Sequence, residues 1–186
     1  MEISARGAAG PAASCEAPLE MLAACHERMR LQFDLLQRLL QHLQQQGADV
    51  QALDACARIQ RYFDTAARDH HCDEEEDLLP ALLEAMAGSD AVCIRDIIAR
   101  LGREHRALEQ QWQSLRKALQ EVQAGDAQAL QPLLVETFIA AYRDHIDYEQ
   151  AEVLPMAERL LDDELLRRIG RAMRLRRGIP DLPAQA

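Results

Sequence analysis

Aromatic residues make up only 4% of this 186-residue chain, and β-branched residues are also scarce. Because strands are enriched in both classes, their shortage argues against a β-rich fold. The residues that dominate instead are Leu, Ala, Gln, Glu and Arg, which form helices readily. The composition therefore predicts an all-α protein, and its length suits one domain with a sizeable core.

The chain also lacks a long apolar run. None approaches the roughly 20 residues that a membrane-spanning helix needs, so we expect no membrane partner. Residues 1–17 lack the basic start and apolar core of a secretory signal, and we interpret them as a disordered leader on a cytoplasmic protein. The formal net charge of −10 argues against nucleic acid as a partner, since phosphate binding needs clustered Lys and Arg.

Paired cysteine motifs are missing as well. The five cysteines are odd in number and form no CxxC pair, so we expect no disulfide framework and interpret most of them as small buried thiols. Cys25 and Cys72 each neighbour a histidine that is discussed below. They are a candidate redox-responsive pair, although neither has a feature that marks a reactive thiolate.

Four long segments carry apolar residues at alternating spacings of three and four, which predicts four amphipathic helices. Glycines and short polar stretches separate the segments, and short connections require neighbouring helices to run antiparallel. We therefore predict an antiparallel up-down-up-down four-helix bundle over residues 18–161, with a short basic fifth helix and a tail over residues 162–186. The expected long helices are about 18–46, 49–87, 90–123 and 126–161.

One histidine replaces an expected apolar residue in each of the four segments. Each consecutive pair is placed almost symmetrically about the glycine between its two helices. At roughly 1.5 Å of rise per residue, neighbouring histidines in antiparallel helices then differ by no more than about 3 Å in height. The spacing therefore predicts one layer of inward-facing imidazoles, formed by His26, His70, His105 and His145.

Two of these histidines are followed four residues later by a glutamate, Glu74 after His70 and Glu149 after His145. Residues four apart share a helix face. A buried carboxylate costs several kcal/mol unless it is paired or bound to a cation. Four imidazoles and two carboxylates exceed what one tetrahedral zinc uses, so they predict two metal ions with positions left for a small ligand.

Several alternatives remain open at this level. Iron, manganese and zinc all accept imidazole and carboxylate ligands. A lone histidine on an apolar face is more often a core residue than a ligand. Glu109, on the side of His105, is either a possible seventh ligand or a surface ion-pair partner. His71 is turned by about 100° from His70, so we expect it to support a ligand or to be exposed, and the alternative is that it is a ligand in place of His70. The acidic residues around Glu74, from Asp73 to Asp77, are expected to face solvent.

The strings DHHCDEEEDLLP and DHIDYEQAEVLP, with single histidines in MLAACHERMR and LGREHRALEQ, closely resemble the hemerythrin-like proteins. The resemblance covers about residues 18–161 and implies a four-helix bundle with a non-haem di-iron centre. His26 and His70 would bind one iron, and His105 and His145 the other. Glu74 and Glu149 would bridge the two irons beside an oxo or hydroxo group. Ferritin-like oxidases, the nearest rivals, use an ExxH string that this chain lacks.

Oxygen-carrying hemerythrins resemble this pattern but place a further histidine where this chain has Glu109, which argues against simple oxygen storage. The resemblance therefore implies a protein that binds O2, NO or peroxide for sensing, detoxification or iron-sulfur repair. A di-iron oxidase or peroxidase, an iron store and a non-catalytic helical interaction module are the alternatives. The arginines of the last helix are a candidate surface for an acidic protein partner: Arg167, Arg168, Arg171, Arg174, Arg176 and Arg177.

Overall fold

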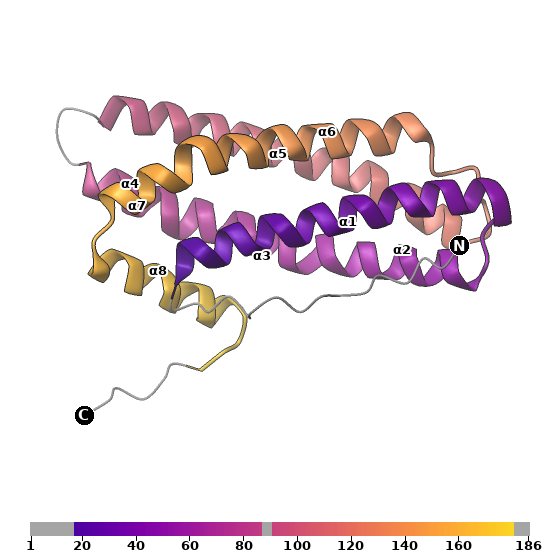
Figure 1. Cartoon of the computed structure of the whole chain (residues 1–186), viewed down its shortest axis with the longest axis horizontal. Helices are drawn as coiled ribbons and strands as arrows, with labels where there is room; N and C mark the ends of the chain where they lie inside the picture. Colours follow the sequence, from indigo (N-terminus) through magenta and orange to yellow (C-terminus); the bar gives the residue numbers. More distant parts are fainter. Residues whose placement is uncertain (1–16, 87–90, 181–186) are drawn as a thin grey trace.

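The computed structural model describes residues 17–86 and 91–180, and within these ranges the chain is helical without strands. Four long rods lie side by side as a bundle, and a fifth helix packs at the end where the first rod begins (Figure 1). The predicted all-α class is therefore confirmed, and the helices form a bundle. Nearly all of the expected leader, as well as Gly88, lies outside the described residues.

The first and third rods are single α-helices, whereas the second and fourth alternate between α-helical and π-helical segments. The first is α1 (Pro18–Gln46) and the third is α5 (Ala91–Gln123). The second rod consists of α2 (Val50–Tyr62), η1 (Phe63–Ala67), α3 (Arg68–Cys72), η2 (Asp73–Leu78) and α4 (Leu79–Ala85). The fourth consists of α6 (Pro132–Tyr148), η3 (Glu149–Val153) and α7 (Leu154–Leu160), and the fifth helix is α8 (Asp163–Arg176).

Two connections follow directly from local chemistry. Gly47 ends α1 with a φ of 75°, and Gly125 follows α5 with a φ of 106°, a backbone region that glycine enters without steric cost. Asp49 caps α2 by accepting a hydrogen bond from the backbone N–H of Ala52 at 2.9 Å. These turns were predicted from the sequence.

The fourth rod begins later than expected. We predicted a start near Asp126, but α6 begins at Pro132. Gln131 is extended, with a ψ of 140°, because the ring of the following proline disfavours the helical conformation at this position. Pro132 then fits the first turn, where its missing N–H leaves no helical hydrogen bond unmade.

Helical structure continues through Pro80 and Pro155, as predicted, and a π-helical segment immediately precedes the turn that contains each proline. Proline donates no N–H, and its ring crowds the carbonyl four residues earlier. A wider π-helical turn accommodates that crowding without ending the helix. Glu74 lies in η2 and Glu149 in η3, so both glutamates of interest lie where the helices widen.

The apolar core consists of two clusters that occupy different lengths of the rods. One includes Met29, Ala67, Leu108 and Ile146 and holds most of the few aromatic side chains. The other includes Leu22, Leu78, Leu101 and Val153, together with Ile169 and Met173 of α8. On every rod, the predicted histidine and glutamate ligands lie where one cluster ends and the other begins. The bundle therefore encloses a polar layer between two apolar blocks.

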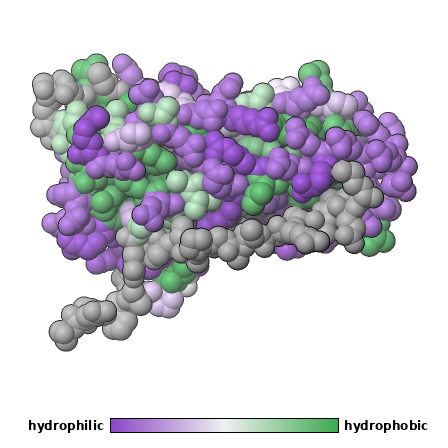
Figure 2. Space-filling view, viewed as in Figure 1, coloured by the Kyte–Doolittle hydropathy of each residue, from purple (hydrophilic) through white to green (hydrophobic). Residues whose placement is uncertain are grey.

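Hydrophilic residues cover most of the face seen in Figure 2, and hydrophobic ones gather toward the end where α1 begins. None of the helices in the described ranges is both long enough and apolar enough to cross a membrane.

Candidate metal centre

Four rods contribute buried polar side chains to a single layer of the bundle. Each of these side chains is at most 4% exposed. Six of the seven residues predicted from the sequence are brought together here: His26 from α1, His70 from α3, Glu74 from η2, His105 from α5, His145 from α6 and Glu149 from η3.

The two carboxylates lie between two groups of imidazoles. Oε1 of Glu74 is 3.2 Å from Nε2 of His70, and its Oε2 is 3.4 Å from Nε2 of His105. Oε2 of Glu149 is 3.1 Å from Nε2 of His26, and its Oε1 is 3.2 Å from Nε2 of His145. Each carboxylate therefore directs one oxygen to each group, which is the arrangement that two bridged cations require.

The Nε2 atoms of His26 and His70 complete the first group, since they lie 3.1 Å apart. Ligand atoms of His26, His70, Glu74 and Glu149 all lie within 4.8 Å of one another. In the second group, the ligand atoms also all lie within 4.8 Å of one another, and they come from Glu74, His105, His145 and Glu149. The layer thus contains two overlapping four-residue sites that share both carboxylates.

Several buried atoms in this layer have no hydrogen-bond partner within the described part of the chain. They include Nε2 of His105 and of His145, Oε2 of Glu74 and both carboxylate oxygens of Glu149. Leaving such groups unpaired costs about 1–3 kcal/mol each. All of them offer lone pairs and lie in the centre of the layer, so bound cations would satisfy them together. The donor set therefore fits a metal pair.

Two further carboxylates orient the histidines from outside. Nδ1 of His105 donates to Oε1 of Glu75 at 2.7 Å, and Nδ1 of His145 donates to Oε2 of Glu104 at 2.9 Å. With Nδ1 protonated, each ring keeps its Nε2 lone pair directed at the centre. We expected Glu75 to face solvent; its side chain is half exposed, yet it holds His105. The only sequence signal for either residue is that each directly neighbours a proposed ligand.

The pKa values of the buried carboxyl and imidazole groups show that the layer does not accommodate two negative charges easily. Burial and the neighbouring Glu149 carboxylate raise the pKa of Glu74 to about 8. Burial also acts to raise the pKa of Glu149, but the imidazoles of His105 and His26, whose Nε2 atoms lie 3.8 and 3.1 Å from its oxygens, hold it well below its usual range. Burial, together with electrostatic repulsion from the neighbouring imidazole of His26, lowers the pKa of His70 well below its usual value. Two neighbouring buried carboxylates therefore cannot both be charged easily unless a cation lies between them.

Glu109, the possible seventh ligand, does not join this layer. Its side chain is exposed and accepts a hydrogen bond from Gln113 on the same helix at 2.5 Å. His71, in contrast, is directed toward the layer, where its ring stacks on that of His105 with the ring centroids 4.1 Å apart. Cys25, Cys56 and Cys72 are free thiols, and burial raises the pKa of all three, so none has the lowered pKa of a reactive thiolate.

The expectation that Asp73 faces solvent is wrong. Its side chain is fully buried and is held by Arg176 and by Arg177, whose Nη2 is 2.5 Å from Oδ2 of Asp73. Arg176 also binds Asp77 and Glu76. Much of the positive charge at the end of α8 is therefore neutralised by the acidic run that surrounds Glu74.

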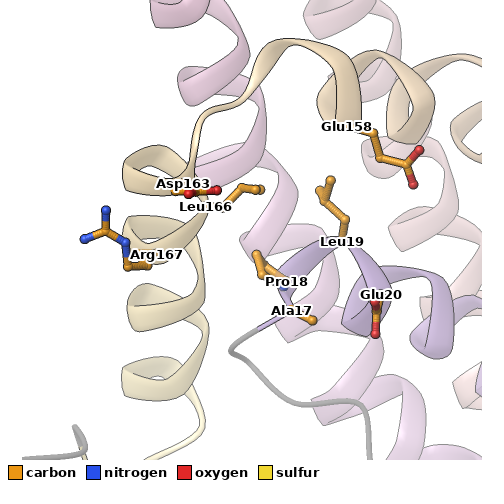
Figure 3. A pocket seen from close by; sticks show the side chains of 8 residues that line it. All are labelled: Ala17, Pro18, Leu19, Glu20, Glu158, Asp163, Leu166 and Arg167. Carbon is orange, nitrogen blue, oxygen red and sulfur yellow. The ribbon is translucent and has the colours of Figure 1, made fainter. Parts of the chain in front are cut away.

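The cavity in Figure 3 is separate from the polar layer. It has a volume of about 480 Å³ and lies between the start of α1, the α7 residue Glu158 and α8. Its walls include Pro18, Glu20, Leu166 and Arg167 and none of the six clustered residues. We therefore assign the chemistry to the enclosed polar layer and not to this cavity.

Comparison with known proteins agrees with the geometry. The sequence model of the hemerythrin HHE cation binding domain matches residues 17–157. An uncharacterized protein of Haemophilus influenzae is 30% identical over 164 residues, which span 88% of this chain and 92% of that protein.

Proposed function

The chain belongs to the hemerythrin HHE cation-binding family, and from this premise we propose that it is a di-iron protein whose small ligand is O2, NO or peroxide. The proposed role is sensing, detoxification or iron-sulfur repair. The observation that carries the proposal is the convergence of buried, unpartnered imidazole and carboxylate atoms from four rods. An ordinary helical core would place apolar side chains there.

We assign His26 and His70 to one iron, His105 and His145 to the other, and Glu74 and Glu149 to both. The carboxylate oxygens support this division, because each glutamate has one oxygen near each pair of imidazoles. The mixture of imidazole and carboxylate donors suits iron, while manganese and zinc share these preferences. Metal analysis therefore has to decide between them.

Bound iron would supply redox chemistry and a coordination position for the small ligand. The protein's own contribution is geometric and electrostatic. Glu75 and Glu104 fix the orientation of two imidazoles, and Glu74 and Glu149 compensate the positive charge of the metals. The apolar clusters on either side of the layer keep bulk water away from it.

We further propose the up-down-up-down order of the rods and a cytoplasmic location. The alternating direction of successive rods in Figure 1 supports the order. Free thiols at Cys25, Cys56 and Cys72 suit a reducing compartment.

The deciding experiment measures metal content by mass spectrometry, together with the ultraviolet-visible spectrum of the air-oxidised protein purified without chelators. We expect about two irons per chain and charge-transfer absorption. Roughly one zinc per chain, or no metal after growth in iron-rich medium, would overturn the proposal. Steady consumption of peroxide or O2 with a reductant would assign an oxidase or peroxidase instead of a binding protein.

A further inference from the structure

Asp73 and Glu74 are consecutive residues of η2 whose side chains leave the helix in different directions. Glu74 is directed into the polar layer, where its oxygens lie 3.2 and 3.4 Å from Nε2 of His70 and of His105. Asp73 is fully buried as well, but its carboxylate contacts the end of α8. Because the two residues share one stretch of backbone, whatever fixes Asp73 also restricts the rotation of the segment that carries Glu74.

Two arginines hold Asp73 from α8 and its C-terminal end. Arg176 donates from Nη1 to Oδ1 of Asp73, and Arg177 donates from Nη1 to Oδ1 at 3.1 Å and from Nη2 to Oδ2 at 2.5 Å. Nη1 of Arg177 also donates to the backbone carbonyl of Met173 at 2.9 Å, which ties the guanidinium to its own helix. Both oxygens of Asp73 therefore accept from charged donors, and such hydrogen bonds are roughly twice as strong as neutral ones.

The residue before the other glutamate is also held by an arginine from a different helix. Tyr148 directly precedes Glu149, and the guanidinium carbon of Arg100 lies 3.4 Å from the centre of its ring. Arg100 belongs to α5, which is one of the four rods. For Glu74, the corresponding contacts come from α8, which packs on the bundle as a fifth helix and lies outside the residues 17–157 that the family model matches. Half of the carboxylate pair thus depends on a helix outside the four rods.

We propose that Asp73, Arg176 and Arg177 position Glu74 for metal binding, so that docking of α8 and metal binding strengthen each other. This inference rests on the proposed function and adds a means of regulation to the same site. With α8 docked, η2 holds Glu74 where its two oxygens reach both groups of imidazoles. By thermodynamic linkage, the factor by which docked α8 raises the metal affinity is also the factor by which bound metal favours docking.

This coupling connects the enclosed layer to the surface of the protein. The inner face of α8 contributes Ile169 and Met173 to the same apolar cluster as Leu78 of η2. Loss of metal would weaken the docking of α8 and expose this face more often. A sensing role would then have a physical output at a helix that supplies none of the six proposed ligands.

The first test compares iron affinity, by chelator competition, and charge-transfer absorption after oxidation in air. The variants are Arg177→Lys and the double variant Arg176→Ala with Arg177→Ala. The matched control is Arg168→Ala, because this arginine lies on the same helix and its pair with Glu84 is exposed. Circular dichroism verifies the helical content of each chain.

We expect about tenfold weaker iron affinity and altered absorption in the double variant, and wild-type values in Arg168→Ala. By charge alone, removing two cationic side chains would strengthen binding of a cation, so weaker binding indicates positioning. Arg177→Lys should lose less affinity than the double variant, since lysine keeps the charge but lacks the planar fork that reaches both oxygens of Asp73. Unchanged or stronger binding in the double variant would overturn the inference and leave the proposed function intact.

The second test uses the unaltered chain and does not depend on the variants folding. Hydrogen exchange is measured by mass spectrometry with and without bound iron. We expect iron to slow exchange in α8 more than in α2 (Val50–Tyr62), although neither helix carries a proposed ligand. Equal slowing in α8 and α2 would indicate general stabilisation and overturn the inference. Failure of the unaltered chain to bind two metals would overturn the proposed function itself, and the inference with it.

Discussion

Glu104 of α5 holds His145 of α6 through a 2.9 Å hydrogen bond between Oε2 and Nδ1. This contact crosses between two rods and fixes the rotation of an imidazole whose Nε2 is directed into the polar layer. Glu104 is only partly buried and is itself bonded to Nε of Arg100 at 2.7 Å. It can therefore be exchanged without opening the core.

We predict that Glu104→Ala weakens metal binding by about 10–100-fold without unfolding the chain. The reason is that His145 loses the partner that orients its ring and raises its basicity as a ligand. Chelator competition on iron-loaded protein measures the effect. Glu109→Ala is the matched control, because it removes an exposed carboxylate from the same helix. Equal losses in the two variants would show that general charge, and not orientation, is responsible.

Direct removal of a proposed ligand should have a larger effect. We predict that His70→Ala and His145→Ala each lose metal, because each truncation removes an imidazole that contacts one of the two glutamates proposed to bridge the metals. His42→Ala should retain the metal content of the wild type, since His42 bonds to Asp49 outside the layer. Metal analysis of the purified variants decides the matter. Full metal content in His70→Ala would remove that residue from the site.

The layer itself could be predicted from the sequence because helical periodicity determines both height and direction. The four-residue spacing of His70 and Glu74 places them on the same helix face. The positions of the glycine turns determine which residues of neighbouring helices lie at the same height. These relationships are local or follow from simple antiparallel packing. They needed no knowledge of contacts between distant residues.

What the sequence did not predict depends on long-range contacts and on irregular helices. Asp73 belongs to an acidic run typical of a solvated face, and nothing near it in sequence indicates partners as distant as Arg176 and Arg177. Regular helical periodicity also does not predict the π-helical segments Phe63–Ala67 and Asp73–Leu78, although a π-helical turn contains more residues than an α-helical turn and therefore shifts the face that follows.

Away from the metal layer, the cap of α2 makes a pH-dependent contribution to stability. Hydrogen bonds from the backbone of Ala52 and from His42 lower the pKa of Asp49 below its ordinary value. A lowered folded-state pKa stabilises the fold above the pKa of the unfolded chain, and this contribution disappears as the pH falls through the folded-state pKa. Asp49→Ala should therefore be less stable than the wild type at pH 7, and the difference should narrow in acid.

Urea unfolding of both metal-free proteins at neutral and acidic pH measures this change. Asp49→Asn is the control, since asparagine also caps helices but has no carboxylate to titrate. The stability difference between the Asn and Ala variants should stay constant across the same pH range. A difference between wild type and Asp49→Ala that does not depend on pH would contradict the assignment.

The contact between α8 and η2 depends on a buried charge with two partners. Asp73 is fully buried, and Arg176 and Arg177 are 17% and 18% exposed, so the ion pairs are largely shielded from water. Removing both arginines would leave a buried carboxylate without these two partners. Because Asp73 directly precedes Glu74, the same loss would disturb the π-helical segment that carries this proposed ligand.

We predict that the double variant Arg176→Ala with Arg177→Ala lowers the free energy of unfolding by about 3–5 kcal/mol, the usual cost of an unpaired buried charge. Urea unfolding of the metal-free chain measures the loss, which should be absent in Arg168→Ala, whose pair with Glu84 is exposed. Adding Asp73→Asn to the double variant removes the buried charge and should recover part of the stability. If Asp73→Asn recovers nothing, the arginines act through packing, and their pairing with Asp73 does not hold α8 in place.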